Sequence, residues 1–513
     1  MSESGWFARG SGAIIVVVVV IIIIIIMETK SEEILGLDHG ALDRARVSRD
    51  PRFDGKFFIA VTSTGIYCRP VCPSRTSKSA NVRYYATAAE AAEAGFRPCL
   101  RCRPEAAPGT PAWLGTSAVV KRALKLIGDG ALDEASVDEL AAGLGIGPRH
   151  LHRLFVQHVG ASPMTVAQTR RLHFAKRLLD DTTLPITQIA LAAGYRSLRR
   201  FNSAFHGAYG RSPRELRRHR SGAPADEVVL RLAYRPPYDW AQVSDALAAR
   251  AAPGVERVDR QGYARTVASD RGHALVRVRP LAGENALELR VSGAAPAQLF
   301  QLSASVRRMF DLAADPARIA HAFRADPLLA ALLERRPGVR IPGAWDAFEC
   351  VVRTVVGDKP KALESLVARA GRPLARSPAD GLTHLFPTPH ALLGTEPAGA
   401  LRDLCLAIAG GAIDLAGPVD DVVADLAAMP GLGADAAQRV ALLGLGEPDA
   451  FPSGDAVLRK MAAIAGPGAL AERAEAWRPW RGYAAVHLWS AAPFGLDLRQ
   501  ASQGQRARRS ANR

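Results

Sequence analysis

Two short stretches, YCRPVCPSR at residues 67–75 and FRPCLRC at residues 96–102, decide the fold of the first domain. They bring four cysteines together in two pairs: Cys68, Cys72, Cys99 and Cys102. Such spacing is typical of a closed tetrahedral zinc site, so we expect these residues to hold one zinc ion. Spacing alone favours a structural role, a folding clip in a nucleic-acid-binding protein. Zinc-bound thiolates are also nucleophiles, so the alternative is that the cluster acts as a chemical reagent.

The sequence around the cysteines predicts a small mixed domain. Residues 56–68 alternate in the manner of two strands, with Thr64 and Gly65 as the turn between them. Residues 87–95 predict a helix that begins after Thr87 as N-cap and stops at Gly95.

The chain has 513 residues and a formal net charge of +16. The length bears on the number of domains, and the charge bears on the kind of partner. This length predicts three or four domains, because single hydrophobic cores stop growing well below it. Residues 148–220 contain 14 lysines and arginines against 3 acidic residues, a concentration that favours a polyanion, and first of all nucleic acid, as partner. Only six cysteines are present, which indicates a reducing compartment and hence a cytoplasmic, nucleoid-associated protein.

Residues 1–26 form a low-complexity segment of their own. The apolar run at residues 13–26 is 14 residues long, whereas a bilayer span needs roughly 20. The run also lacks the flanking features of a signal peptide. We interpret residues 1–26 as an extension upstream of a true start at Met27, and we expect no membrane partner. The alternative is a membrane-tethered regulator.

Residues 136–215 contain an internal repeat with an offset of 50 residues. Four residues recur: Phe155, Gly160, Ser162 and Pro163 return as Phe205, Gly210, Ser212 and Pro213. Each copy has the pattern of a helix-turn-helix unit, with a linking helix between the copies. We expect the inner faces to bury Val137, Leu140, Ala141, Leu144, Leu151, Leu154, Phe155, Val159, Ile186, Ile189, Ala190, Leu198, Phe201 and Phe205. The outward faces carry the candidate DNA contacts Arg149, Arg153, Arg196, Arg199 and Arg200. A plain helical bundle with a solvated basic face is the alternative.

Beyond a small-residue linker at 221–227, the chain changes character. Strand patterns dominate up to residue 293, and helical patterns dominate from Ala294 onward. The sequence PGLG joins two helical segments as a hairpin, and its Gly431 and Gly433 allow backbone N–H groups to approach a phosphate. Such a hairpin can be a plain helix turn, but the carboxylate that follows at Asp455 favours a helix-hairpin-helix glycosylase pattern.

The first domain resembles the zinc domain of the bacterial Ada adaptive-response family, over about residues 38–106. The resemblance rests on the motifs STGIYCRPVC and GFRPCLRC. It implies that Cys68 accepts a methyl group irreversibly from a DNA methyl-phosphotriester, a choice among four cysteines that physical reasoning alone could not make. It also implies DNA contacts at Thr64, Arg75 and Arg97. Methylation of one thiolate would make the zinc centre less negative, so we expect it to strengthen binding to DNA.

Two further resemblances cover the rest of the chain. Residues 115–218 resemble the DNA-binding domain of AraC-type activators, which implies RNA polymerase as a further partner. Residues 226–495 resemble 3-methyladenine DNA glycosylase II through segments such as YRPPYDW, RRMFDLAADP and AWRPWRGYAAVHLW. This second resemblance implies that Asp455 stabilises positive charge on the sugar as the base leaves, and that Trp489 forms an aromatic wall for the flipped base.

Three positions and one loop depart from the families. Pro73 stands where the Ada family carries an arginine that contacts DNA. Asp435 stands at a substrate-specificity position where the glycosylase has a tryptophan, and where lyase-active relatives carry the Schiff-base lysine. Arg439 replaces an active-site tyrosine, and the duplex-wedging loop after Gly357 is shortened. We therefore expect no lyase activity.

Taken together, the patterns predict a multidomain α+β protein with a small α/β zinc domain held by four cysteines, an all-α double helix-turn-helix and a glycosylase made of an α/β lobe and an all-α domain. The expected boundaries are 1–26 (extension), 27–110 (zinc domain), 113–220 (helix-turn-helix domain), 226–293 (α/β lobe), 294–495 (helical glycosylase domain) and 496–513 (basic tail). The function implied is a DNA alkylation-response protein that accepts methyl groups, activates repair genes and removes alkylated bases such as 3-methyladenine. The alternative is a zinc-bearing activator whose glycosylase-like tail is degenerate and only clamps DNA.

Overall fold

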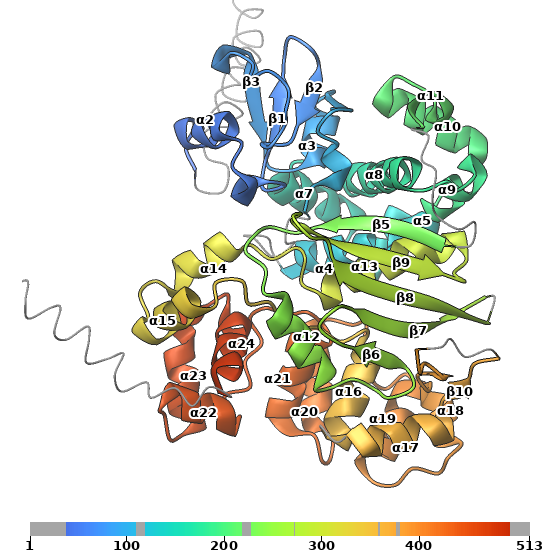
Figure 1. Ribbon diagram of the computed structural model, residues 1–513, viewed down its shortest axis with the longest axis vertical. Helices are drawn as coiled ribbons and strands as arrows, with labels where there is room; N and C mark the ends of the chain where they lie inside the picture. The colour runs from blue at the N-terminus through green and yellow to red at the C-terminus, as the bar shows by residue number, and fades with distance from the viewer. Residues whose placement is uncertain are drawn as a thin grey trace, which may run out of the picture.

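The computed structural model describes residues 37–108, 118–217, 227–270, 272–357, 360–375 and 380–492. The predicted extension at 1–26, residues 221–226 of the predicted linker and the predicted tail at 496–513 lie outside the described residues. The described chain forms a small cysteine domain and a helical region in the upper half of Figure 1, with a larger C-terminal region below them. In the ranges that the structure describes, no helix combines the length and apolar composition needed to cross a bilayer.

The cysteine domain is built on a four-stranded sheet of order β3-β1-β2-β4, in which β2 and β4 are parallel and the other pairs antiparallel. The predicted turn at Thr64 and Gly65 joins β1 to β2, and Thr87 caps the predicted helix by accepting from the Glu90 N–H at 3.0 Å. The elements are α2 (His39–Ser48), β1 (Phe58–Val61), β2 (Ile66–Cys68), β3 (Val82–Tyr85), α3 (Ala88–Glu93) and β4 (Arg97–Pro98).

The helical region contains both predicted helix-turn-helix units. The elements are α4 (Ala118–Asp129), α5 (Ala131–Glu134), α6 (Val137–Gly143), α7 (Pro148–Val159), α8 (Pro163–Asp181), α9 (Ile186–Ala192), α10 (Leu198–Tyr209) and α11 (Pro213–Leu216). The first unit is α6–α7, the second is α9–α10, and α8 is the linking helix. Capping boxes at Ser136–Glu139 and Ser212–Glu215 fix the start of α6 and of α11.

Most of the predicted inner-face residues are buried or half-buried, but Leu198 is 41% exposed. The prediction for Leu198 was therefore wrong. Leu198 is the first residue of α10, directly after the N-cap Ser197. The next apolar residue, Phe201, lies almost one turn further along and is fully buried. Helical spacing alone does not show that the first position of α10 still projects outward.

The C-terminal region opens with a five-stranded antiparallel sheet of order β5-β9-β8-β7-β6. Four of these strands were predicted, and β6 was not. The elements are β5 (Glu227–Ala233), α12 (Trp240–Ala248), β6 (Glu256–Val258), β7 (Tyr263–Ser269), β8 (Gly272–Pro280) and β9 (Ala286–Ser292).

The remainder is mainly helical, as predicted, with one small two-stranded sheet. Its elements are α13 (Leu299–Met309), α14 (Pro316–Phe323), α15 (Pro327–Arg335), α16 (Ala347–Val356), α17 (Pro360–Ala370), β10 (Arg372–Pro373), β11 (His384–Leu385), α18 (Pro389–Leu393), α19 (Ala400–Ala409), α20 (Val419–Ala428), α21 (Gly433–Leu443), α22 (Ala456–Ala462), α23 (Pro467–Ala474) and α24 (Arg481–Ala491). The PGLG hairpin joins α20 to α21, and Asp455 lies at the start of α22.

One hydrophobic core crosses the boundary between the helical region and the C-terminal region. It joins residues of α8, α9 and α10 to the sheet residues of β5, β7, β8 and β9 and to α13. At the boundary Phe174 of α8 packs edge-to-face on Phe300 of α13, with ring centroids 4.9 Å apart. Figure 1 shows the sheet directly beneath α8 and α9. The second helix-turn-helix unit and the α/β lobe are therefore packed as one body.

Candidate functional sites

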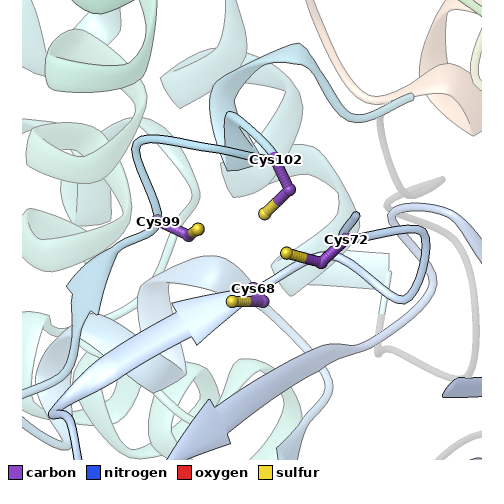
Figure 2. A group of neighbouring side chains, drawn as sticks. All are labelled: Cys68, Cys72, Cys99 and Cys102. Atoms are coloured by element: carbon purple, nitrogen blue, oxygen red, sulfur yellow. The ribbon is translucent and has the colours of Figure 1, made fainter. Parts of the chain in front are cut away.

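The four cysteines of the first domain converge, as predicted. Cys68 ends β2, Cys72 lies in the loop that follows, and Cys99 and Cys102 follow β4. Figure 2 shows their sulfur atoms grouped around a common centre. The four Sγ atoms lie within 4.8 Å of one another, close to the separation of about 3.8 Å that a tetrahedral Zn–S₄ site requires.

The chemistry of the cluster fits a single zinc ion. Hydrogen bonds with Cys68, Cys72 and Cys99 raise the pKa of the Cys102 thiol far above its usual range, because they favour its protonated form. A divalent cation at the centre allows all four sulfurs to ionise together. The Arg69 backbone N–H also donates to Cys102 Sγ at 3.3 Å, which supports a negative charge there.

Two side chains next to Cys68 connect the cluster to the rest of the molecule. The Arg69 guanidinium forms an ion pair with Asp54 and donates to the Cys102 carbonyl at 3.0 Å. The Asp54 carbonyl in turn accepts from Arg235, just after β5, at 2.9 Å. On the other side of Cys68, the Tyr67 hydroxyl lies 2.8 Å from Nε2 of His173 on α8. The cysteine cluster is thus linked to both of the other regions.

The predicted DNA contacts of the first domain all lie on its surface. Thr64, Arg75 and Arg97 are exposed. A Cβ built on Gly210, at the end of α10, would lie 2.6 Å from Arg97 Nη1. Arg97 therefore lies between the cysteine domain and the second helix-turn-helix unit.

The predicted recognition helices present their arginines outward. Arg149 and Arg153 on α7, Arg199 and Arg200 on α10 and Arg196 just before α10 are all exposed. Behind them Phe155 and Phe205 are fully buried and hold the two helices against their partners. This geometry suits insertion of a helix into a groove of DNA, and the individual contacts stay predictions.

A cavity of about 330 Å³ lies between the α/β lobe and the helical part of the C-terminal region. Its wall includes Asp435, Arg439 and Asp455, three residues singled out in the sequence, and it also includes Trp345 and Tyr263. Pockets of this size and composition are typical of sites for small, partly apolar ligands. A single nucleobase fits such a volume.

Asp455 is held firmly at the wall of the cavity. Its Oδ1 accepts from the N–H groups of Val457 and Leu458 at 2.9 and 3.0 Å, as the N-cap of α22, and from the Trp489 indole at 3.3 Å. Its Oδ2 accepts from Arg439 Nη2 at 2.7 Å. The carboxylate is therefore fixed in its orientation, but a guanidinium already neutralises it.

Asp435 has a role that the sequence did not reveal. Its Oδ1 accepts from the Gly454 N–H at 2.8 Å, so the first turn of α21 holds the loop that carries Asp455. The hairpin glycines have φ values of +86° and +76°, in the left-handed region that favours glycine. The hairpin, Asp435 and Asp455 thus form one connected unit. The shortened loop after Gly357 includes Asp358 and Lys359, which lie outside the described residues.

Trp489 is not among the residues that line this cavity, but its indole donates to Asp455 Oδ1 at 3.3 Å and lies 5.7 Å from the Arg439 guanidinium, so its role as an aromatic wall stays a prediction. Trp345, which does line it, was missed although it lies in the segment GAWDAFE. Also missed was a buried ion-pair network at the cavity floor, in which Arg353 Nη2 lies 2.8 Å from Glu256 and 3.0 Å from Glu349. Glu349 has the i,i+4 spacing of a helical ion pair with Arg353, a signal that could have found it, whereas Glu256 lies 97 residues from Arg353 and no local motif marks it.

Family models match three parts of the chain. The metal binding domain of Ada matches residues 41–105, a helix-turn-helix domain matches residues 140–219, and the AlkA N-terminal domain matches residues 229–346. Together these matches cover the cysteine cluster, both recognition helices and the α/β lobe. They agree with the three resemblances inferred from the sequence.

Three curated relatives span different parts of the chain. The "Probable bifunctional transcriptional activator/DNA repair enzyme AlkA" of Mycobacterium tuberculosis is 39% identical over 474 residues, which cover 87% of this chain and 95% of the relative. The "DNA-3-methyladenine glycosylase 2" of Escherichia coli is 30% identical and covers 50% of this chain and 95% of the relative. The Escherichia coli Ada enzyme is 38% identical and covers 29% of this chain and 40% of the relative.

Proposed function

The chain belongs to the family of bifunctional transcriptional activator/DNA repair enzymes of the AlkA type, and from this membership we propose three linked activities. The cysteine domain accepts a methyl group from a DNA methyl-phosphotriester. The helix-turn-helix region activates transcription of repair genes. The C-terminal region hydrolyses the N-glycosidic bond of alkylated bases such as 3-methyladenine. All three activities take double-stranded DNA as substrate or partner.

In the first activity Cys68 is the acceptor. Its sulfur attacks the methyl carbon of the phosphotriester, the S–C bond forms as the C–O bond breaks, and a phosphodiester anion leaves. When bound, a zinc ion keeps the four sulfurs as nucleophilic thiolates. The thioether is stable, so each copy of the protein reacts once. The partial exposure of Cys68 supports this assignment.

In the second activity α7 and α10 enter successive major grooves of a promoter. The exposed arginines Arg149, Arg153, Arg199 and Arg200 supply phosphate and base-edge contacts. The methylated form binds more tightly and recruits RNA polymerase in the cytoplasm, at the nucleoid.

In the third activity the alkylated base leaves its sugar inside the cavity beside Asp455. The carboxylate stabilises positive charge on the sugar while water attacks C1′ and the C1′–N bond breaks. No lysine stands at position 435, so no Schiff base forms and the enzyme is a monofunctional hydrolase without lyase activity. The hairpin at Gly431 and Gly433 binds a backbone phosphate through its N–H groups.

The observation that carries the proposal is the oriented Asp455 carboxylate at the wall of a base-sized cavity, in the same chain as the four-sulfur cluster. The test uses purified protein and methylated duplex DNA. Mass spectrometry of the protein should show one added methyl group, and chromatography of the supernatant should show free 3-methyladenine. Release that is no faster than in protein-free DNA would contradict the third activity.

The ion pair between Arg439 and Asp455 favours a second candidate for the C-terminal region. A neutralised carboxylate stabilises a cation poorly, so this region could act only as a DNA clamp that strengthens promoter binding. In that case wild-type protein releases no base, yet deletion of the C-terminal region weakens binding to undamaged DNA.

A further inference from the structure

The carboxylate of Asp455 and the indole of Trp489 together form a receptor for a cation. A carboxylate attracts positive charge directly, and the face of an indole attracts it through its quadrupole. The Trp489 N–H donates to Asp455 Oδ1 at 3.3 Å, which holds the two groups together. A positively charged alkylated base is the kind of ligand that such a pair would stabilise.

In the structure this receptor already holds a cation from the protein itself. Arg439 Nη2 lies 2.7 Å from Asp455 Oδ2, and the Arg439 guanidinium lies 5.7 Å from the centroid of a Trp489 ring. Arg439 projects from α21, one turn after Asp435, and lines the same cavity. We propose that Arg439 is the specificity-determining residue of the base-removal site, because its guanidinium occupies the contacts with Asp455 and Trp489 that a positively charged nucleotide would use.

The charges around the cavity support this proposal. Its wall contains three guanidinium groups, Arg250, Arg353 and Arg439, and three carboxylates, Glu256, Asp435 and Asp455. Arg353 is paired with Glu256 on the floor of the cavity, so its charge is not available to neutralise Asp455. Removal of the Arg439 charge would leave one carboxylate in excess, at the residue proposed to face the sugar.

The consequence is selection by charge, which deepens the proposed function and rests on it. A positively charged nucleotide must displace Arg439 from Asp455 and Trp489 before it can be stabilised, whereas a neutral nucleotide need not compete for the same contacts. Asp455 keeps its orientation when Arg439 leaves, because the N–H groups of Val457 and Leu458 still hold Oδ1. Arg439 thus lowers affinity for cationic ligands without being needed to position the carboxylate.

The test measures binding rather than turnover. Two duplexes are compared, one with a positively charged pyrrolidine in place of a nucleotide and one with a neutral tetrahydrofuran of the same shape. Arg439→Gln should increase the preference for the cationic duplex roughly tenfold, the size expected for loss of a competing cation at a partly desolvated carboxylate and indole. Arg439→Lys, which keeps the charge, should leave the ratio near that of wild type.

The matched control is Arg369→Gln on α17, which removes one exposed positive charge from the same region away from the cavity wall. This variant should weaken binding to both duplexes equally and leave the ratio of the two affinities unchanged. Because each ratio comes from one protein preparation, a partly misfolded variant does not alter it. An unchanged or reduced ratio for Arg439→Gln would overturn the proposal.

A parallel assay separates this inference from the proposed function. If wild type and Arg439→Gln both fail to release 3-methyladenine while the binding ratio still shifts, base removal is refuted and the cation-competition role of Arg439 stands. If both proteins release the base and the binding ratio does not shift, base removal stands and the cation-competition role of Arg439 is refuted. When both statements are correct, Arg439→Gln releases 3-methyladenine faster than wild type at subsaturating DNA.

Discussion

Single residues decide which of the four sulfurs can react. Cys99 and Cys102 are buried, whereas Cys68 and Cys72 are partly exposed. Spacing could not show which of the four cysteines accepts the methyl group. Burial argues against Cys99 and Cys102 as the acceptor. The choice of Cys68 over Cys72 still rests on the resemblance to the Ada family.

We predict that methyl-phosphotriester DNA methylates Cys68 alone. Cys68 lies at the end of β2 and is partly exposed, where an entering phosphotriester can reach it. Peptide mass spectrometry should place the methyl group there, and a methyl group on Cys72, Cys99 or Cys102 would overturn the assignment. As a companion variant, Cys72→Ala should lose zinc and unfold the cysteine domain, because metal binding and folding are coupled at such sites.

For the glycosylase site, Asp455→Asn should reduce release of 3-methyladenine by roughly 10²–10³-fold or more. Asparagine keeps the shape of the side chain but removes the negative charge that stabilises the developing cation. Single-turnover base release measures the effect. Promoter binding and Cys68 methylation serve as internal controls and should be unchanged, since Asp455 lies outside both regions. Equal rates for the two proteins would show that the carboxylate plays no part.

The position of Asp455 could be predicted from its spacing after the PGLG hairpin, but its partners could not. Arg439 was noted as a departure from the family, yet nothing in the local sequence shows that it pairs with Asp455. The hydrogen bond from the Trp489 indole to Asp455 likewise follows from no local pattern. Such contacts depend on how α21, α22 and α24 pack against one another, and a sequence pattern shows only which face of each helix is apolar.

At the scale of elements, the contact between β2 and α8 is made by Tyr67 and His173. Burial lowers the pKa of His173 to about 3, with a smaller contribution from the nearby charge of Arg177. The folded protein therefore keeps His173 neutral, while the unfolded chain takes up a proton near pH 6.5. The stability from this group is complete above pH 6.5 and is lost as the pH falls toward 3.

We therefore predict that wild-type protein loses stability between pH 7 and pH 5 more steeply than His173→Gln. One proton taken up only by the unfolded chain is worth up to about 1.4 kcal/mol per pH unit. Denaturant titrations at the two pH values measure the shift of the transition midpoint. His487, whose pKa burial lowers to about 4, contributes with the same sign to both proteins and cancels in the comparison. Parallel curves for the two proteins would contradict the prediction.

Across the whole molecule, the shared core between the second helix-turn-helix unit and the sheet was not predictable. Phe201 and Phe205 were correctly expected to be buried, but a local pattern cannot tell whether they face only their own unit or a distant sheet as well. The four strands of the lobe alternated clearly enough to be predicted, whereas β6 is only three residues long and gave no such signal. The order of the domains followed from the sequence, and their mutual packing required the structure.

We predict that Phe174→Ala loosens both partners of this core. Removal of a buried phenyl ring costs about 3–5 kcal/mol, and Phe174 packs directly on Phe300 of the C-terminal region. Hydrogen exchange should increase in β5 and β9 as well as in α8 and α10. Phe155→Ala, in the separate core of the first unit, is the matched control and should affect α6 and α7. Unchanged protection of β5 and β9 in Phe174→Ala would show that the two regions are independent.

The switch in DNA affinity also belongs to the whole molecule. Methylated protein should bind its promoter more tightly than unmethylated protein, and the difference should shrink as salt rises. The cause is the loss of one negative charge from a centre that lies near phosphates, an effect that mobile ions screen. Binding isotherms at low and high salt measure it, and equal affinities at low salt would rule out the electrostatic mechanism.

The continuous packing of α8, α9 and α10 on the lobe sheet has a consequence for how the cell deploys this protein. The promoter-binding unit and the base-removal region move as one body. A copy bound at a promoter is therefore not available to search the rest of the chromosome for damaged bases. Each promoter that is occupied therefore lowers the number of protein copies free for repair by one. Repair capacity recovers only if the activated genes encode further repair enzymes. We expect the ratio of promoter-bound copies to copies free for repair to be set by how many promoters the methylated form occupies.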